Sequence, residues 1–230
     1  MEIFYWSDYA CPFCWIGETR LKKALAQMPG GSEIRLVMKA FELDPYANQL
    51  CLGDTPARFA RKYGLSHGEA RKRVEHISAL GEAEGLDLQY AKTRFTSTRD
   101  AHRLTKYAQS LEDFSLADRL SEELYRAYFS RGLELADHDA LVEIAESCGL
   151  DAARVRQILS SDEFRAEVLS DEREANENGI RAVPCFVIGS LALQGACGSH
   201  DMLRFLHAAM EDATERKTVA GEDGCGPDGC

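Results

Sequence analysis

Two cysteines near the start of the chain are the residues with the clearest chemistry. They lie in Cys11-Pro12-Phe13-Cys14, shortly after an apolar run at residues 3–6. A cysteine attacks only as its thiolate, and a second cysteine this close can make and break a disulfide with it. We therefore predict a redox centre in which Cys11 attacks a disulfide and Cys14 resolves the product. Half of a zinc site, or two unrelated core thiols, are the alternatives, because a structural zinc needs four ligands.

The segments on either side favour the redox interpretation. Residues 3–6 are typical of a strand, and from Trp15 to Met28 the apolar residues recur at helical spacing. This pattern places both cysteines at the N-terminus of a helix. Free backbone N–H groups and the positive end of the helix dipole favour a thiolate there. We expect Cys11 to be exposed and Cys14 to be shielded.

Farther along the chain the patterns predict two more extended regions around a long helical one. Residues 32–41 alternate as a strand, so the first strand, helix and strand form a βαβ unit with parallel strands. Residues 55–178 are helical by period and by capping, as in the capping box at Ser66 and Glu69. Residues 183–188 and 191–193 predict a hairpin. A last helix is expected to begin near Ser199 and to bury Leu203, Leu206, Met210 and Ala213.

Composition and charge limit the class of protein. The chain has 230 residues, of which 45% are hydrophobic, which is enough for a sizeable core. Its 27 basic and 38 acidic side chains give a net charge of −11, which argues against charge-driven binding to nucleic acid or anionic lipid. No signal peptide or apolar run of membrane-spanning length is evident. We therefore expect a cytoplasmic protein whose eight cysteines are mostly free thiols.

Several segments together resemble the DsbA family of thioredoxin-fold oxidoreductases, and more closely its cytosolic FrnE-like and DsbM-like members. The similarity spans roughly residues 2–213. The segments that carry it are Cys11-Pro12-Phe13-Cys14-Trp15-Ile16-Gly17, Phe41-Glu42-Leu43-Asp44-Pro45, Arg99-Asp100-Ala101-His102-Arg103-Leu104, Ala127-Tyr128-Phe129 and Gly179-Ile180-Arg181-Ala182-Val183-Pro184.

The resemblance implies an α/β fold, a thioredoxin fold interrupted by an inserted α-helical subdomain. Residues 1–54 and 179–214 would form a discontinuous thioredoxin-like domain, residues 55–178 the helical insertion, and residues 215–230 a tail rich in cysteine and glycine. In such proteins the proline that corresponds to Pro184 is cis and packs against the two active-site cysteines. The residue before it, here Val183, is then free to pair with the substrate backbone.

The activity implied is that of a cytosolic thiol-disulfide oxidoreductase acting on disulfide-bearing proteins. A disulfide reductase or isomerase recycled by glutathione is favoured, because the glutathione pool keeps the cytosol reducing, and no permanently bound cofactor is expected. One alternative is a glutathione-dependent isomerase or transferase similar to the kappa class, in which serine commonly holds the active-site position. Another is a noncatalytic thiol sensor or metal-binding protein.

Glutathione is expected in a groove between Cys11, Val183 and the start of the last helix. The N–H groups of Ser199-His200-Asp201 could hold a carboxylate, as helix N-termini do, and Asp201 could take the ammonium group. Similarity to the kappa class supports this placement, since kappa-class enzymes have a Gly-Ser-Asp stretch at the corresponding helix start. Here the stretch is Gly198-Ser199-His200-Asp201, one residue longer, and ordinary capping by Ser199 is the alternative.

Pro12, Phe13 and His102 complete the expected substrate contacts. His102 could lie over the redox site and stabilise the Cys11 thiolate or carry a proton. Alternatively, it is a histidine that packs or caps the helical subdomain.

Four other cysteines leave alternatives open. Cys185 and Cys197 bracket the hairpin and could form a second redox pair, although Cys185 alternates with apolar residues and could be an ordinary core thiol. Cys225 and Cys230 lie in the tail and could close a disulfide, pass electrons to the main site or bind a soft metal. An incidental solvated tail is the other interpretation.

Overall fold

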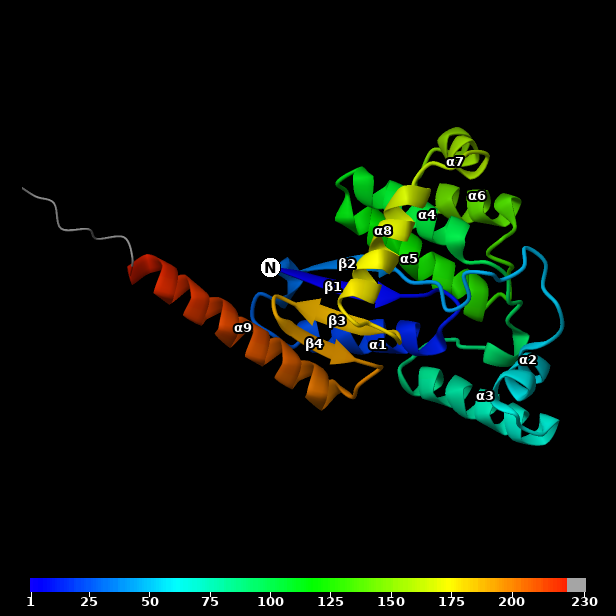
Figure 1. The fold of residues 1–230 in the computed structure, drawn as a ribbon, viewed down its shortest axis with the longest axis horizontal. Coiled ribbons are helices and arrows are strands. Elements are labelled where there is room, and N and C mark those ends of the chain that lie inside the picture. The colour runs from blue at the N-terminus through cyan, green and yellow to red at the C-terminus, as the bar shows by residue number, and fades with distance from the viewer. Residues whose placement is uncertain (223–230) are drawn as a thin grey trace, which may run out of the picture.

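The centre of the molecule is a four-stranded sheet. In this computed structural model, residues 1–222 are described, and for residues 213–222 the description is limited to the helical backbone. The strand order is β2-β1-β3-β4, with β1 and β2 parallel and β3 antiparallel to both of its neighbours (Figure 1). The strands are β1 (Glu2–Ser7), β2 (Arg35–Ala40), β3 (Cys185–Ile188) and β4 (Leu191–Gln194). The predicted βαβ unit and hairpin are confirmed.

The helices follow the predicted order, with differences at their ends. α1 begins at Pro12 with Cys11 as its N-cap, which confirms that the cysteines lie at a helix N-terminus. A 3-10 turn at Gly31–Glu33 replaces the start of the predicted second strand. No helix in the described part of the chain is both long and apolar enough to cross a membrane. The helices are α1 (Pro12–Leu25), α2 (Thr55–Tyr63), α3 (His67–Ala83), α4 (Arg99–Ser110), α5 (Phe114–Phe129), α6 (His138–Ser147), α7 (Ala152–Leu159), α8 (Arg165–Glu177) and α9 (Ser199–Glu222).

Both faces of the sheet are covered, and the alternation along β1 decides which side chains face which layer. Ile3 and Tyr5 belong to the main core with α1, whereas Trp6 packs on the other face with Ala175 of α8 and Ile180, which follows α8. The indole of Trp6 also donates a hydrogen bond of 2.9 Å to the backbone carbonyl of Asp171. The main core includes side chains from both the thioredoxin-like segments and the helical insertion, so the predicted boundary at residue 178 does not separate two cores.

A buried ion pair attaches α8 to the sheet. The Asp171 carboxylate forms an ion pair with Lys106 of α4 and accepts a hydrogen bond of 2.8 Å from the backbone N–H of Ala40 at the end of β2. Lys39 lies 3.5 Å from the same carboxylate. Because a buried charge is costly unless it is paired, these contacts hold α4, α8 and β2 in one arrangement.

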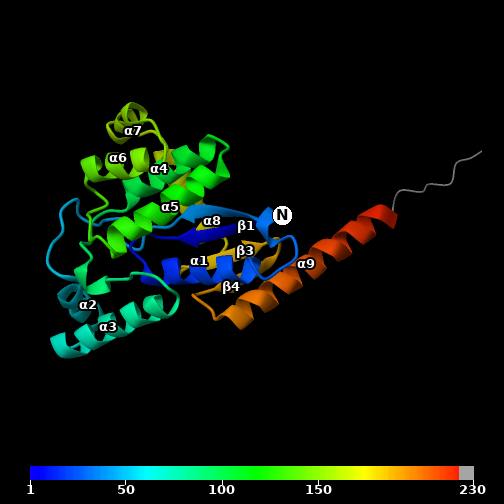
Figure 2. The same cartoon turned by 180° about the vertical axis from the view of Figure 1, so that it is seen from behind.

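The last helix is longer than predicted. α9 packs on α1 and β4 at its start and then runs away from the body of the molecule in both ribbon views (Figures 1 and 2). Leu206 is buried as expected, but Met210 is 38% exposed, so its predicted burial is wrong. The adjacent Ala209 is buried, so the buried stripe of α9 runs beside Met210 and does not include it. The predicted start of the tail at residue 215 lies inside α9.

Candidate active site

The two cysteines stand at the start of α1, as predicted. Cys11 is the N-cap residue in an extended conformation, and Pro12 occupies the first turn, where its missing N–H costs no helical hydrogen bond. Both cysteines are free thiols. Cys14 is fully buried, and Cys11 is only 5% exposed, so the expectation that Cys11 is openly exposed is wrong. It lies on the wall of a cavity instead, because chain segments distant in sequence surround it.

The environments of the two thiols differ. Burial raises the pKa of Cys14 well above its usual value, the neighbouring Cys11 raises it further, and the Ser7 hydroxyl lowers it. The Ser7 hydroxyl is 2.5 Å from the buried Tyr125 hydroxyl. The Cys11 thiol faces the cavity and lies 3.7 Å from the carbonyl oxygen of Val183, to which it can donate. This arrangement keeps Cys14 protonated behind Cys11, which fits their predicted roles.

Pro184 packs directly on α1, and Gly17 makes this possible. The Val183–Pro184 peptide bond is cis, which confirms the expectation from the family resemblance. A methyl group on Gly17 would lie 2.9 Å from Cγ of Pro184 and 3.3 Å from Cζ of Phe186. Ordinary carbon contacts are about 3.5–4.0 Å. Glycine at this position therefore lets the proline loop approach the helix that carries the cysteines.

A buried charged cluster lies behind the cysteines and joins the residues just before Cys11 to two of the segments that carry the family resemblance, 41–45 and 99–104. Asp8 accepts hydrogen bonds from the backbone N–H of Ala10, at 3.2 Å, and of Leu43, at 2.7 Å. Glu42 accepts from Arg99 at 2.9 Å. Burial raises the pKa of Glu42, and Arg99 opposes this rise. The cluster fixes the start of the loop that follows β2.

His102 belongs to this buried cluster. It is 1% exposed, its Nε2 lies 3.6 Å from Asp8 Oδ1, and its ring packs on Tyr9 at 4.9 Å between centroids. It does not line the cavity, so the predicted contact between His102 and a bound substrate or glutathione gains no support from this cavity. The neighbouring Tyr9 and Asp8 shield it from solvent. Its alternative interpretation as a packing histidine fits these contacts.

A second buried acid follows Cys14 by one helical turn and was not predicted. Glu18 is buried, with Lys22 at 2.8 Å as its ion-pair partner. Burial raises the pKa of Glu18, and the charge of Lys22 lowers it by a smaller amount. The signal in the sequence was an acid four residues after Cys14, on the buried face of the helix. Helical spacing could have indicated the i,i+4 pair with Lys22, but not the contact with Tyr5 on the central strand.

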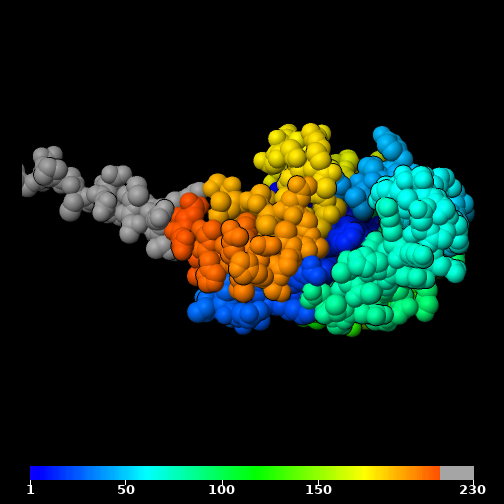
Figure 3. Space-filling model, turned by 90° about the horizontal axis from the view of Figure 1, so that it is seen from below, coloured from blue at the N-terminus to red at the C-terminus, as the bar shows by residue number. Residues whose placement is uncertain are grey.

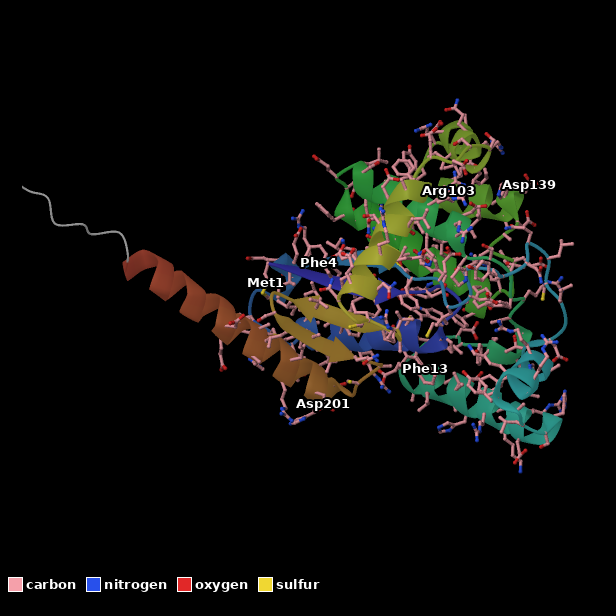
Figure 4. The ribbon with its side chains drawn as sticks, in the orientation of Figure 1. Met1, Phe4, Phe13, Arg103, Asp139 and Asp201 are labelled. Atoms are coloured by element: carbon pink, nitrogen blue, oxygen red, sulfur yellow. The ribbon has the colours of Figure 1, made fainter. Side chains whose placement is uncertain are left out.

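The cavity beside Cys11 has a volume of about 780 Å³. Its walls come from residues 10–13, the loop after β2, helices α2 and α3, and residues 181–183. In Figure 3 the blue atoms of the N-terminal segment are visible between the cyan α2 and α3 and the yellow-to-orange C-terminal part. Phe13, at the end of α1 that faces α3, is 39% exposed (Figure 4). Pro12, Phe13 and Val183 thus line the same cavity as Cys11, as expected for substrate contacts.

The start of α9 lies apart from this cavity. Ser199, His200 and Asp201 are exposed and are absent from its lining. Figure 4 shows Asp201 well separated from Phe13. His200 and Asp201 instead face each other, with 3.7 Å between Nδ1 and Oδ1. A ligand that occupies the Cys11 cavity would not contact these three residues, so their predicted binding of glutathione gains no support from it.

The remaining cysteines do not form a second pair in the described chain. Cys185 is buried in the small core on the α8 face, whereas Cys197 packs against the main core on the other face. Both are free thiols, and burial raises the pKa of each. Cys185 is therefore a core thiol. Cys225 and Cys230 lie outside the described residues, among which no group of three His, Cys, Asp or Glu side chains is placed to hold a metal ion.

Comparison with known proteins agrees with this geometry. The uncharacterized protein YwbO of Bacillus subtilis is 24% identical over 204 residues, which cover 86% of this chain and 92% of YwbO. The probable DsbA oxidoreductase SCO1869 of Streptomyces coelicolor is 30% identical, with a TM-score of 0.86 and coverage of 100% of this chain and 93% of that one. The cytosolic disulfide reductase DsbM of Pseudomonas aeruginosa, also solved with GSH, shares the fold at 17% identity and a TM-score of 0.61, over 92% and 99% of the two chains. Residues 2–210 match the DSBA-like thioredoxin domain. The chain therefore belongs to the DSBA-like thioredoxin family of thiol-disulfide oxidoreductases.

Proposed function

We propose that the chain is a cytoplasmic disulfide reductase that acts on protein disulfides through Cys11 and Cys14 and is restored by glutathione. The observation that carries the proposal is the asymmetry of the two thiols. Cys11 caps α1 on the wall of a large cavity, and Cys14 lies fully buried behind it. A substrate disulfide in the cavity can reach only the first of them.

In the first step the Cys11 thiolate attacks one sulfur of the substrate disulfide. A bond forms between Cys11 and that sulfur, the substrate S–S bond breaks, and the other substrate sulfur leaves as a thiolate. The extended N-cap position supports this step, because unpaired backbone N–H groups at the start of a helix favour an anion.

In the second step Cys14 displaces the substrate from Cys11. Its proton passes to the leaving thiolate, a Cys11–Cys14 disulfide forms, and the substrate has gained two electrons. Cys11 is one of the causes that raise the pKa of Cys14, and in the mixed disulfide Cys11 carries no charge. Formation of the mixed disulfide therefore removes one of the causes that raise the pKa of Cys14, while burial, the largest cause, remains.

Two molecules of glutathione would complete the cycle. The first opens the Cys11–Cys14 disulfide and forms a mixed disulfide on Cys11, and the second releases it as oxidised glutathione. The solved complex of DsbM with GSH supports glutathione as a ligand of this fold. We place glutathione in the Cys11 cavity and not at the start of α9. Isomerisation would share the first step, with a substrate thiol in place of Cys14 in the second.

The test is glutathione-dependent turnover of a protein disulfide. Reduced glutathione, the protein and oxidised insulin are mixed, and the formation of oxidised glutathione and free insulin chains is measured. We expect turnover by the wild type and by Cys148→Ser, a control at the end of α6 remote from the cavity, and none by Cys11→Ser. Turnover by Cys11→Ser at the wild-type rate would overturn the proposal.

A further inference from the structure

The cavity beside Cys11 gathers much of the exposed apolar surface of the chain. Of the eleven large apolar side chains that are exposed in the described residues, six line it. They come from α1, from the loop after β2 and from the end of α2. They are Phe13, Leu43, Tyr46, Leu50, Leu52 and Tyr63. An apolar patch concentrated at one reactive group indicates a surface that binds apolar side chains.

The same cavity has a charge opposite to that of the whole chain. Its lining includes the five cations Arg58, Arg61, Lys62, Arg73 and Arg181 but only one carboxylate, Asp44. The chain carries a net charge of −11, so this cationic lining is a local reversal.

These five cations also lack close ion-pair partners, although Glu69, one turn before Arg73 on α3, is near enough for the charge of Arg73 to lower its pKa. Among the side chains described, those of residues 1–212, none of the five forms an ion pair, whereas most other lysines and arginines in that range do. Arg58 is held over the ring of Phe95, with 3.5 Å from its guanidinium carbon to the ring centre, and its N–H groups have no carboxylate. A low-dielectric wall with unneutralised charge attracts ligands of opposite sign.

We infer that this cavity selects disulfides that lie in polypeptide segments rich in both acidic and apolar side chains. The inference depends on the proposed function, since it names the substrates of the same thiol. Glutathione alone does not account for the surface, because it carries a net charge of about −1 and no large apolar side chain. A peptide that places carboxylates beside the cations of α2 and Arg73 of α3, and apolar side chains on the loop after β2, matches both properties.

The experiment compares two synthetic peptides that each contain one disulfide-linked cysteine pair. The flanking positions hold Leu and Glu in one peptide and Leu and Lys in the other. We expect the wild type to reduce the acidic peptide with about tenfold higher kcat/KM, which corresponds to about 1.4 kcal/mol of transition-state binding. Because exposed charges are screened by salt, the preference should shrink as the ionic strength rises to about 1 M.

Matched variants locate the effect in the cavity. Arg61→Glu/Arg73→Glu reverses two lining charges, and Arg71→Glu/Lys72→Glu makes the same change of charge on the exposed part of α3 that does not line the cavity. We expect the first variant to lose the preference for the acidic peptide and the second to retain most of it. Far-UV circular dichroism checks that both are folded.

Each outcome has a separate meaning. If the wild type reduces neither peptide and also fails to reduce a small neutral disulfide, the proposed function itself is refuted. Reduction of both peptides with equal kcat/KM would refute only the selection inferred here. An equal loss of preference in the two double variants would also refute it, because the effect would then come from net charge and not from the cavity. A wild-type preference that stays unchanged at about 1 M salt would refute it without any variant, because a preference based on charge must weaken under screening.

Discussion

Replacing Gly17 by alanine tests whether the packing of α1 on Pro184 sets the geometry of the redox site. The added methyl group would lie 2.9 Å from Cγ of Pro184, 3.3 Å from Cζ of Phe186 and 3.4 Å from Cα of Ala196. Because carbon atoms pack at about 3.5–4.0 Å, the proline ring must retreat by about 0.6 Å or more. That movement takes Pro184 away from the helix that carries both cysteines.

The effects on stability and on activity should differ in size. Alanine is favoured over glycine inside a helix by about 1 kcal/mol, whereas overpacking of a core typically costs about 1–3 kcal/mol. We therefore expect the free energy of unfolding to fall by only about 0–2 kcal/mol. A misplacement of about 1 Å can cost about a hundredfold in rate, so the smaller shift should lower kcat/KM for disulfide reduction by about tenfold.

The assay combines urea unfolding with turnover of a disulfide peptide in the presence of glutathione. Gly68→Ala is the matched control, because Gly68 is helical and a methyl group there meets no atom within 4 Å. The control should keep the wild-type rate. A Gly17→Ala protein that is folded and reduces disulfides at the wild-type rate would refute the argument that this contact positions the site.

Three further results are expected. Burial raises the folded pKa of Glu18 above its unfolded value of about 4.3, so the wild type should lose stability as the pH rises from there through the folded pKa. The free energy of unfolding of Glu18→Gln, measured with urea, should fall less than that of the wild type across this pH range. If the two proteins show the same dependence on pH, a raised pKa of Glu18 is refuted. Asp171→Asn leaves the buried Lys106 without its anion and should lower the free energy of unfolding by about 3 kcal/mol. The double variant Asp171→Asn/Lys106→Met should recover part of this loss. A loss under about 1 kcal/mol in Asp171→Asn would show that the ion pair is not needed for stability. Iodoacetamide at neutral pH should modify Cys11 before Cys14, because burial raises the pKa of Cys14. Mass spectrometry measures the two rates of modification, and equal rates would contradict the expectation.

Features that depend on short stretches of sequence were predictable. The apolar run before Cys11 and the helical spacing after it predict the strand and the helix that hold the cysteines, and both are present. The hairpin and the cis bond at Pro184 are confirmed as well. Backbone pattern and residue type decide the strand, the helix and the hairpin locally, so one sequence is enough to find them. The cis bond is different, because X-Pro bonds are more often trans, and it was expected only from the family resemblance.

Features that depend on which segments meet were not predictable. The sequence suggested an exposed Cys11, but residues 43–52 and α3 come from elsewhere in the chain to enclose it. The same holds for His102, whose side chain is covered by Tyr9 and Asp8 from the segment before the cysteines. Helical period identifies the apolar face of α9 but not its exact margins, so Met210 is exposed although the adjacent Ala209 is buried. The cationic lining also escapes the sequence, because it combines residues from α2, α3 and the segment before β3.

The order of attack by the two cysteines is the central claim, and trapping the mixed disulfide tests it most directly. Cys14→Ser is incubated with the acidic disulfide peptide, and the products are digested without reductant and mapped by mass spectrometry. The account predicts a stable peptide adduct on Cys11, because the resolving thiol is gone, and no adduct in Cys11→Ser. An adduct on another cysteine of the Cys14→Ser protein, or an adduct on Cys14 in Cys11→Ser that forms at the same rate, would contradict it.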